Sequence, residues 1–325
     1  MSVVAVGSML MVANLNYSIE HMTASVAFLF PTFVMRREEY RLDEIPGYLE
    51  VRAPLVDRAA AVVAITPATF AFPDRDKPVA GLPDTLQAHY ASYIESVAIG
   101  AWLEPRVGKC DLVAGYSMGL FAALCHTGAM AFEDGLTLMR GLCVAVQDSV
   151  DPGAYAIGAI DGLPPDAVAG VAATWPGIEV VDIYGQGTTI VTGREGDVAA
   201  VLDTCQQRGA TYTRLTPATA PYHSTALKAV RPIIEELADL TAIRSPRCRV
   251  VSALTQRLLS SPEDVRLEIA SNVSTAMNWY ATMREVRQLG MTALCECGSS
   301  NSLANMARRD LPGDYIIQDV RGLDR

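Results

Sequence analysis

The fold is decided by residues 111–119, which read DLVAGYSMG. The three apolar residues after the aspartate are typical of a short strand buried in a parallel sheet, and residues 118–130 continue with apolar side chains in a helical rhythm. A G-x-S-x-G motif between such a strand and a helix predicts a nucleophile elbow, a tight turn from which the serine hydroxyl projects. Ser117 is therefore the candidate nucleophile, and the alternative is a serine that only caps a helix.

A serine nucleophile needs a base, and the chain contains 4 histidines. His21 belongs to an uncertain leader, and His89 follows a loop that contains proline and aspartate. His126 comes nine residues after Ser117 on the same predicted helix, and a rise of about 1.5 Å per residue carries it more than ~10 Å away. His223 remains, in the loop segment APYHS at 220–224, and it is our candidate base.

The chain between these two residues contains a second pattern. Six segments alternate as strand, helix, strand, strand, helix and strand, which is the order of a ferredoxin-like unit; they span 154–160, 165–174, 179–183, 188–192, 197–207 and 211–215. Outside it, apolar patterns predict strands at 26–30, 111–114, 248–253 and 292–296, with helices at 94–103, 224–240 and 276–289. We therefore predict an α/β fold: a hydrolase-like parallel-sheet large domain of residues 23–152 and 218–325, with an inserted ferredoxin-like small subdomain at 153–217.

Composition excludes several classes of protein. The 325 residues include 36 Asp+Glu and 26 Lys+Arg, a formal net charge of −10, which argues against broad nucleic-acid binding. A hydrophobic fraction of 50% excludes a disordered chain. The 7 scattered cysteines do not form a disulfide framework at this length, so we expect free thiols in a cytoplasmic protein and no zinc site at Cys295 and Cys297. The mostly apolar stretch 2–15 lacks a basic region and is too short to span a bilayer. We interpret residues 1–22 as a leader that is disordered or derived from an expression vector, and the alternative is a functional arm.

The position of the histidine separates families of serine enzymes. An α/β-hydrolase usually carries its histidine near the carboxyl end, after a separate acid. Here 325 − 223 = 102 residues follow His223, and a whole predicted subdomain precedes it. The layout of an α/β-hydrolase is therefore excluded.

The arrangement resembles the malonyl-CoA:acyl-carrier-protein transacylase family, which includes the acyltransferase domains of polyketide synthases. The resemblance covers about residues 24–320 and rests on the elbow, Gly128, the small subdomain, Trp279 and four short motifs, which are FLFP at 28–31, AAL at 122–124, PYHS at 221–224 and ECG at 296–298. It implies a ping-pong mechanism, in which Ser117 accepts an acyl group from a thioester of CoA or a carrier protein. The phosphopantetheine thiol of an acyl carrier protein then removes the acyl group.

The resemblance also implies how the histidine is held. His223 acts as base and then as acid, and a backbone carbonyl at Asn272 orients it in place of a carboxylate. No bound cofactor or metal is implied, and neither a nucleic acid nor a membrane is an expected partner.

Two positions depart from the family pattern. A glutamine of the family's first loop supplies an oxyanion N–H, but here the loop reads PTFV at 31–34, so the predicted backbone donors are Phe33 and Met118. The family arginine that pairs with the malonyl carboxylate falls on Leu142, 25 residues after the serine, and Arg140 points about 200° away on a helix. Loss of a bidentate partner for a buried carboxylate costs several kcal/mol, enough to abolish useful selection of malonyl groups.

Three tyrosines, Tyr116, Tyr184 and Tyr222, stand where the family usually has other residues. With Leu142 they predict an acyl pocket for an uncharged, larger acyl group, and the alternative is that they only pack. We therefore expect a discrete, trans-acting S-acyltransferase of polyketide or related natural-product biosynthesis, loading a carrier protein with a non-malonyl acyl group. The alternatives are an acyl-thioester hydrolase on the same Ser–His pair, malonyl transfer despite the missing arginine, and a non-catalytic subunit that docks carriers.

Acyl carrier proteins are generally acidic, so an acidic transferase is expected to gather cations at one docking face. The candidates lie on the helix after Trp279 and near the end of the chain, and they are Arg284, Arg287, Arg308 and Arg309. The alternative is an ordinary solvated basic surface.

Overall fold

A computed structural model describes residues 25–32, 42–64, 84–151, 153–299, 301–313 and 315–319. The predicted leader at 1–22 and the predicted oxyanion donor Phe33 lie outside these residues.

The large domain is built on a parallel sheet. Its strands run in the order β7-β2-β1-β8-β9, and every neighbouring pair is parallel. The strands are β1 Val26–Phe30, β2 Leu112–Gly115, β7 Arg249–Val251, β8 Ala293–Glu296 and β9 Ile316–Gln318. Phe30 pairs with Gly115, so β1 and β2 end side by side, directly before the G-x-S-x-G turn.

Alternation along β1 explains why helices cover both faces of this sheet. Phe28 and Phe30 contribute to one apolar cluster, and Ala27 and Leu29 contribute to the other. The first cluster draws on α1 Tyr48–Val63, α2 Asp84–Val107, α3 Gly119–His126, α4 Phe132–Ser149, α7 Arg231–Asp239 and α8 Pro262–Ser271. The second draws on α9 Trp279–Gln288 and α10 Ser302–Asp310. Short 3₁₀ helices occupy Leu42–Glu44, Thr225–Val230 and Asn272–Ser274.

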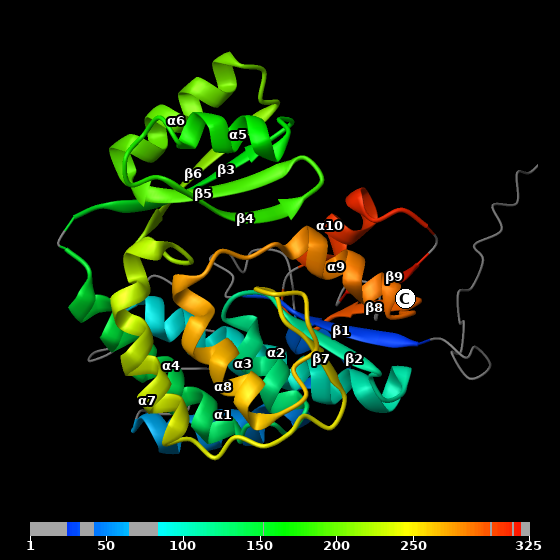
Figure 1. Ribbon diagram of the computed structural model, residues 1–325. Coiled ribbons are helices and arrows are strands. Elements are labelled where there is room, and N and C mark those ends of the chain that lie inside the picture. The colour runs from blue at the N-terminus through cyan, green and yellow to red at the C-terminus, as the bar shows by residue number, and fades with distance from the viewer. Residues whose placement is uncertain are drawn as a thin grey trace, which may run out of the picture.

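The inserted subdomain is a four-stranded antiparallel sheet with two helices on its outer face (Figure 1). Along the chain it comprises β3 Tyr155–Asp161, α5 Pro165–Ala172, β4 Glu179–Gly185, β5 Thr188–Arg194, α6 Glu195–Gln207 and β6 Tyr212–Ala218. The strand order β4-β5-β3-β6 and the alternation of elements are ferredoxin-like. The predicted fold class, a parallel-sheet domain carrying this subdomain, is confirmed.

One predicted element is divided in the structure. Residues 224–240 were expected to form a single helix, but a 3₁₀ helix ends at Val230 and α7 begins at Arg231. Pro232 lies in the first turn of α7, where its missing N–H costs no helical hydrogen bond, so the proline starts a new helix at this point. In the described part of the chain, no helix is both long and apolar enough to cross a membrane.

Candidate active site

Ser117 stands on a strained turn between β2 and α3. Its φ of 54° is left-handed, which a residue with a Cβ rarely adopts. A Cβ at Gly119 would overlap the carbonyl of Phe30, and a Cβ at Gly115 would collide with the backbone of Leu120. Both glycines of the motif are therefore required, because strand β1 and helix α3 approach this turn too closely for any side chain.

His223 faces the serine from the loop that follows the small subdomain. Ser117 Oγ and His223 Nε2 are 2.8 Å apart, within hydrogen-bond distance. His223 also has a left-handed φ of 63°, and its N–H donates to the carbonyl of Val273 at 2.6 Å. Two strained backbones held by the fold bring together the predicted nucleophile and the predicted base, which are 106 residues apart.

The imidazole of His223 is buried, and burial lowers its pKa to about 4. The backbone groups of Asn272 and Thr275 act in the opposite direction and raise the pKa. Nδ1 nevertheless makes no hydrogen bond of ordinary geometry with a described residue, so orientation by Asn272 stays a prediction. The imidazole is neutral at pH 7, which is the state that a general base requires.

The backbone N–H of Met118, the second predicted oxyanion donor, lies among the described residues. It lies at the N-cap of α3 and donates to no described backbone carbonyl, whereas the next three N–H groups bond back to Tyr116, Ser117 and Met118. A free N–H at the positive end of a helix suits a developing negative charge. The side chain of Asn272 donates to the Ser117 carbonyl over a long 3.4 Å.

Tyr116 connects the elbow to the small subdomain. Its hydroxyl donates to Asp182 Oδ2 at 2.9 Å, and Asp182 Oδ1 accepts from the N–H of Trp279 at 3.0 Å. The ring of Tyr116 packs edge-on against Tyr184 and Trp279, with centroids 5.4 and 5.3 Å apart. Burial raises the pKa of Asp182 to about 7, opposed by these two hydrogen bonds. Asp182 could not be recognised from the sequence, because nothing in the strand EVVDIYG at 179–185 marks a carboxylate that bridges two domains.

The other two predicted pocket tyrosines also use their hydroxyls within the chain. Tyr184 donates to the carbonyl of Ser302 at 3.0 Å, which ties β4 to α10. Tyr222 shares a hydrogen bond of 3.0 Å with Thr219. Burial raises the pKa of both phenols, so they remain neutral.

A small cavity of about 10 Å³ lies beside the elbow, and this is roughly the room for one water. The residues that line it come from α2, from the turn and helix at the elbow, and from two single positions. They are His89, Ser92, Tyr93, Ser96, Met118, Gly119, Ala122, Pro31 and Met139. Burial lowers the pKa of His89 to about 4, so its imidazole is neutral. The predicted pocket residues Tyr116, Leu142, Tyr184 and Tyr222 are not among those lining this cavity.

Comparisons with known proteins agree with this geometry, although no protein-family model matches the chain. The chain is 25% identical over 255 residues to the malonyl CoA-acyl carrier protein transacylase of Haemophilus influenzae, covering 76% of this chain and 78% of that protein. The acyl-carrier-protein S-malonyltransferase of Burkholderia pseudomallei has the same fold, with a TM-score of 0.82 at 23% identity over 92% of this chain and 98% of that one. The chain is thus similar in sequence and in fold to the malonyl-CoA:acyl carrier protein transacylases.

Two further matches extend the comparison to proteins of polyketide biosynthesis. The polyketide biosynthesis protein ThaF of Burkholderia thailandensis is 24% identical over 221 residues, which is 67% of this chain but 19% of ThaF. A malonyl-transacylase solved in complex with a type II polyketide synthase acyl-carrier protein has a TM-score of 0.75 at 20% identity, over 93% of this chain and 98% of that one.

Within the transacylase fold, Leu142 is a buried core residue of α4. It is 2% exposed and belongs to the apolar cluster beneath the sheet. Arg140 is exposed, because two residues on a helix turn its side chain to the other side. No arginine or lysine is among the described residues that line the cavity at the elbow.

Three of the four arginines proposed for carrier docking make contacts within the chain. Arg308 pairs with Asp319 at 2.9 Å. Arg309 pairs with Asp310 at 2.8 Å and donates to Thr188 of the small subdomain. Arg287 donates to the carbonyl of Pro312. Arg284 is exposed and forms no hydrogen bond or ion pair with a described residue, which leaves it the freest of the four.

Proposed function

We propose that the protein is a carrier-protein S-acyltransferase that works through an acyl-Ser117 intermediate. One observation carries this proposal: on a family elbow with a left-handed serine, Ser117 Oγ lies 2.8 Å from Nε2 of a neutral, buried imidazole. That pair can activate a hydroxyl against a thioester without a third ionised group. The transacylase names of the relatives, and the carrier complex of one of them, support a carrier protein as the acceptor.

The first half-reaction acylates the serine. His223 Nε2 takes the proton of Ser117 as its oxygen attacks the thioester carbonyl, and the resulting oxyanion accepts a hydrogen bond from the N–H of Met118. The tetrahedral intermediate then expels the thiol of the donor, which receives the proton from His223. The acyl group is left as an ester on Ser117.

The second half-reaction returns the enzyme to its starting state. The phosphopantetheine thiol of a carrier gives its proton to His223 and attacks the ester carbonyl. Collapse of the second intermediate breaks the ester bond and returns the proton to Ser117. Because burial lowers the pKa of His223 to about 4, the imidazole is ready to accept a proton in both steps at neutral pH.

We further propose that the transferred acyl group is uncharged. Leu142 supplies no partner for a carboxylate, Arg140 faces solvent, and His89 beside the elbow is neutral. A carboxylate buried without a cation or hydrogen bonds costs several kcal/mol, so a malonyl group gains little here. The match to ThaF supports polyketide or related natural-product biosynthesis as the setting.

Hydrolysis of the same intermediate is the competing function. The cavity at the elbow has polar lining groups and room for about one water, which could attack the ester in place of a thiol.

Partitioning of the acyl group distinguishes these functions. The protein is incubated with a neutral acyl-CoA and a holo acyl carrier protein, and acyl-carrier and free acid are both quantified by mass spectrometry. Transfer predicts that most of the acyl group reaches the carrier and that Ser117→Ala forms neither product above background. Free acid as the main product, with little acyl-carrier, would establish the hydrolase instead.

A further inference from the structure

Three side chains able to bind metal meet at the end of the parallel sheet opposite the active site, and a second cysteine lies beside the first. Glu104 lies in the last turn of α2, Cys110 precedes β2, His126 ends α3 and Cys248 precedes β7. Because β2 and β7 are parallel, both cysteines lie at the amino ends of strands, whereas Ser117 follows the carboxyl end of β2. The cluster is therefore separate from the Ser–His pair.

The separations of the ligand atoms suit a shared ion. One ligand atom each from Glu104, Cys110 and His126 lies within 4.8 Å of the other two. The Sγ atoms of Cys110 and Cys248 are 3.4 Å apart. Two sulfurs held tetrahedrally at about 2.3 Å from zinc lie ~3.8 Å apart, whereas a disulfide joins them at about 2.05 Å. The observed separation is closer to that of two sulfurs on one metal ion.

Within the described part of the chain, His126 offers a buried ring nitrogen beside Cys110 that no hydrogen bond of ordinary geometry satisfies. Its ring packs against Phe28 and Phe30, with centroids 5.2 and 5.5 Å away, and a Cβ at Gly100 would lie 3.0 Å from Nδ1. Nε2 is buried and makes no hydrogen bond of ordinary geometry with any described residue. A disulfide between the two cysteines would leave this nitrogen unsatisfied, whereas a metal ion bound through it removes the cost of burying it.

The charges also fit a divalent cation. Two thiolates and one carboxylate carry −3, and an ion of +2 leaves −1, which the neighbouring Arg247 balances. The Arg247 guanidinium donates to the carbonyls of His126 and Thr127 at 2.9 and 3.1 Å, fixing the end of α3.

We propose that Glu104, Cys110, His126 and Cys248 form a structural site for a divalent transition-metal ion, zinc being the ion that this sulfur, nitrogen and oxygen set fits best. Binding replaces the two thiol protons, which leave to solvent, and transfers no electron. The ion joins the ends of α2 and α3 to the starts of β2 and β7. It therefore stabilises the framework beneath the elbow and takes no part in acyl transfer.

Cobalt provides the probe, because thiolate-bound Co²⁺ in a tetrahedral site absorbs visibly. The reduced, chelator-treated full chain is titrated with Co²⁺ alone, beside Cys110→Ala/Cys248→Ala, His126→Gln and the control Cys205→Ala, a buried thiol of the small subdomain. We expect one Co²⁺ per chain with a thiolate charge-transfer band in the wild type and the control. The double variant loses the band, and His126→Gln binds at least ~10-fold more weakly.

Thermal unfolding gives an independent measure. Zn²⁺ at a hundredfold excess over its Kd should raise the Tm of the wild type and of Cys205→Ala by about 5 °C, with no rise in the double variant. The proposal is overturned if the reduced wild type shows no thiolate band with Co²⁺. It is equally overturned if the folded double variant binds Co²⁺ as tightly as the wild type.

Discussion

Asp182 makes stability depend on pH in a way that can be calculated from the structure. Its carboxyl group is buried between the elbow and α9, and burial raises its pKa from 3.8 to about 7. A rise of about 3 units at 1.36 kcal/mol each corresponds to about 4 kcal/mol. Because the folded pKa is raised, this stability is fully present below pH 3.8 and is lost as the pH rises through about 7.

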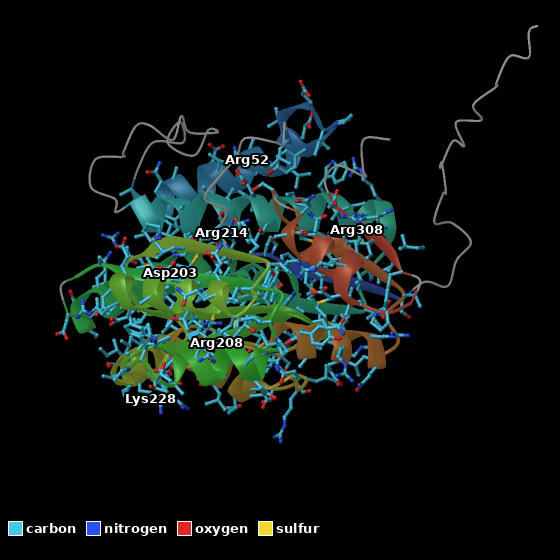
Figure 2. The ribbon with its side chains drawn as sticks, turned by 90° about the horizontal axis from the view of Figure 1, so that it is seen from above. Arg52, Asp203, Arg208, Arg214, Lys228 and Arg308 are labelled. Atoms are coloured by element: carbon cyan, nitrogen blue, oxygen red, sulfur yellow. The ribbon has the colours of Figure 1, made fainter. Side chains whose placement is uncertain are left out.

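The test is Asp182→Asn, which keeps the shape and an acceptor oxygen but never ionises. Free energies of unfolding are measured in urea at pH 4, 5.5, 7 and 8. The free energy of unfolding of the variant, taken relative to that of the wild type, should increase by about 4 kcal/mol between pH 4 and pH 8. Asp203→Asn is the matched control, because Asp203 is an exposed carboxylate on α6 of the same subdomain (Figure 2).

A pH-independent difference between Asp182→Asn and the wild type, within ~1 kcal/mol, would refute this reasoning. It would mean that the hydrogen bonds from Tyr116 and Trp279 keep Asp182 ionised despite its burial. An equal pH dependence in the Asp203 control would show that general charge, rather than this buried group, sets the trend.

Four further predictions concern the active site and the proposed carrier-docking surface. His223→Ala should slow acylation and transfer by ~10²–10⁴ in single-turnover assays, and wild-type rates would remove His223 as the base. Because the pKa of His223 is about 4, the acylation rate of the wild type should stay level from pH 8 to about 5.5 and fall below that, whereas a midpoint near 6.5 would contradict a desolvated imidazole. Leu142→Arg should raise kcat/KM for malonyl-CoA relative to a neutral acyl-CoA, with Arg140→Leu as the control; an unchanged ratio in a folded variant would show that position 142 does not meet the acyl group. Arg284→Glu should raise the KM for the carrier at low salt and leave hydrolysis of a small thioester unchanged, and equal loss of both would indicate misfolding.

The elbow was predictable because its motif is local in the sequence. The base was predictable by elimination among the histidines. The motif around Ser117 lies within five residues, and its glycines are needed because neighbouring backbone leaves no room for a side chain at either position. His223 emerged because the other three histidines could be set aside. The fold class followed from the order of the short apolar segments, because that order fits one parallel sheet with one inserted ferredoxin-like subdomain.

Residues brought together over long distances could not be predicted in this way. Asp182 is one carboxylate in an apolar strand, and only the packed structure shows that it joins Tyr116 to α9. Cys110 and Cys248 are 138 residues apart and look like scattered buried thiols until β2 and β7 align them. The break before α7 was different, because Pro232 already carried the signal within a helical pattern that seemed continuous.

The most direct test of the central claim is the intact mass of the protein after brief exposure to an equimolar mixture of malonyl-CoA and butyryl-CoA. Peptide mapping then locates the added group. We expect a butyryl adduct on Ser117 in excess of any malonyl adduct, and none on Ser117→Ala. A dominant malonyl adduct would contradict the uncharged acyl group, and an adduct that survives in Ser117→Ala would contradict the nucleophile itself.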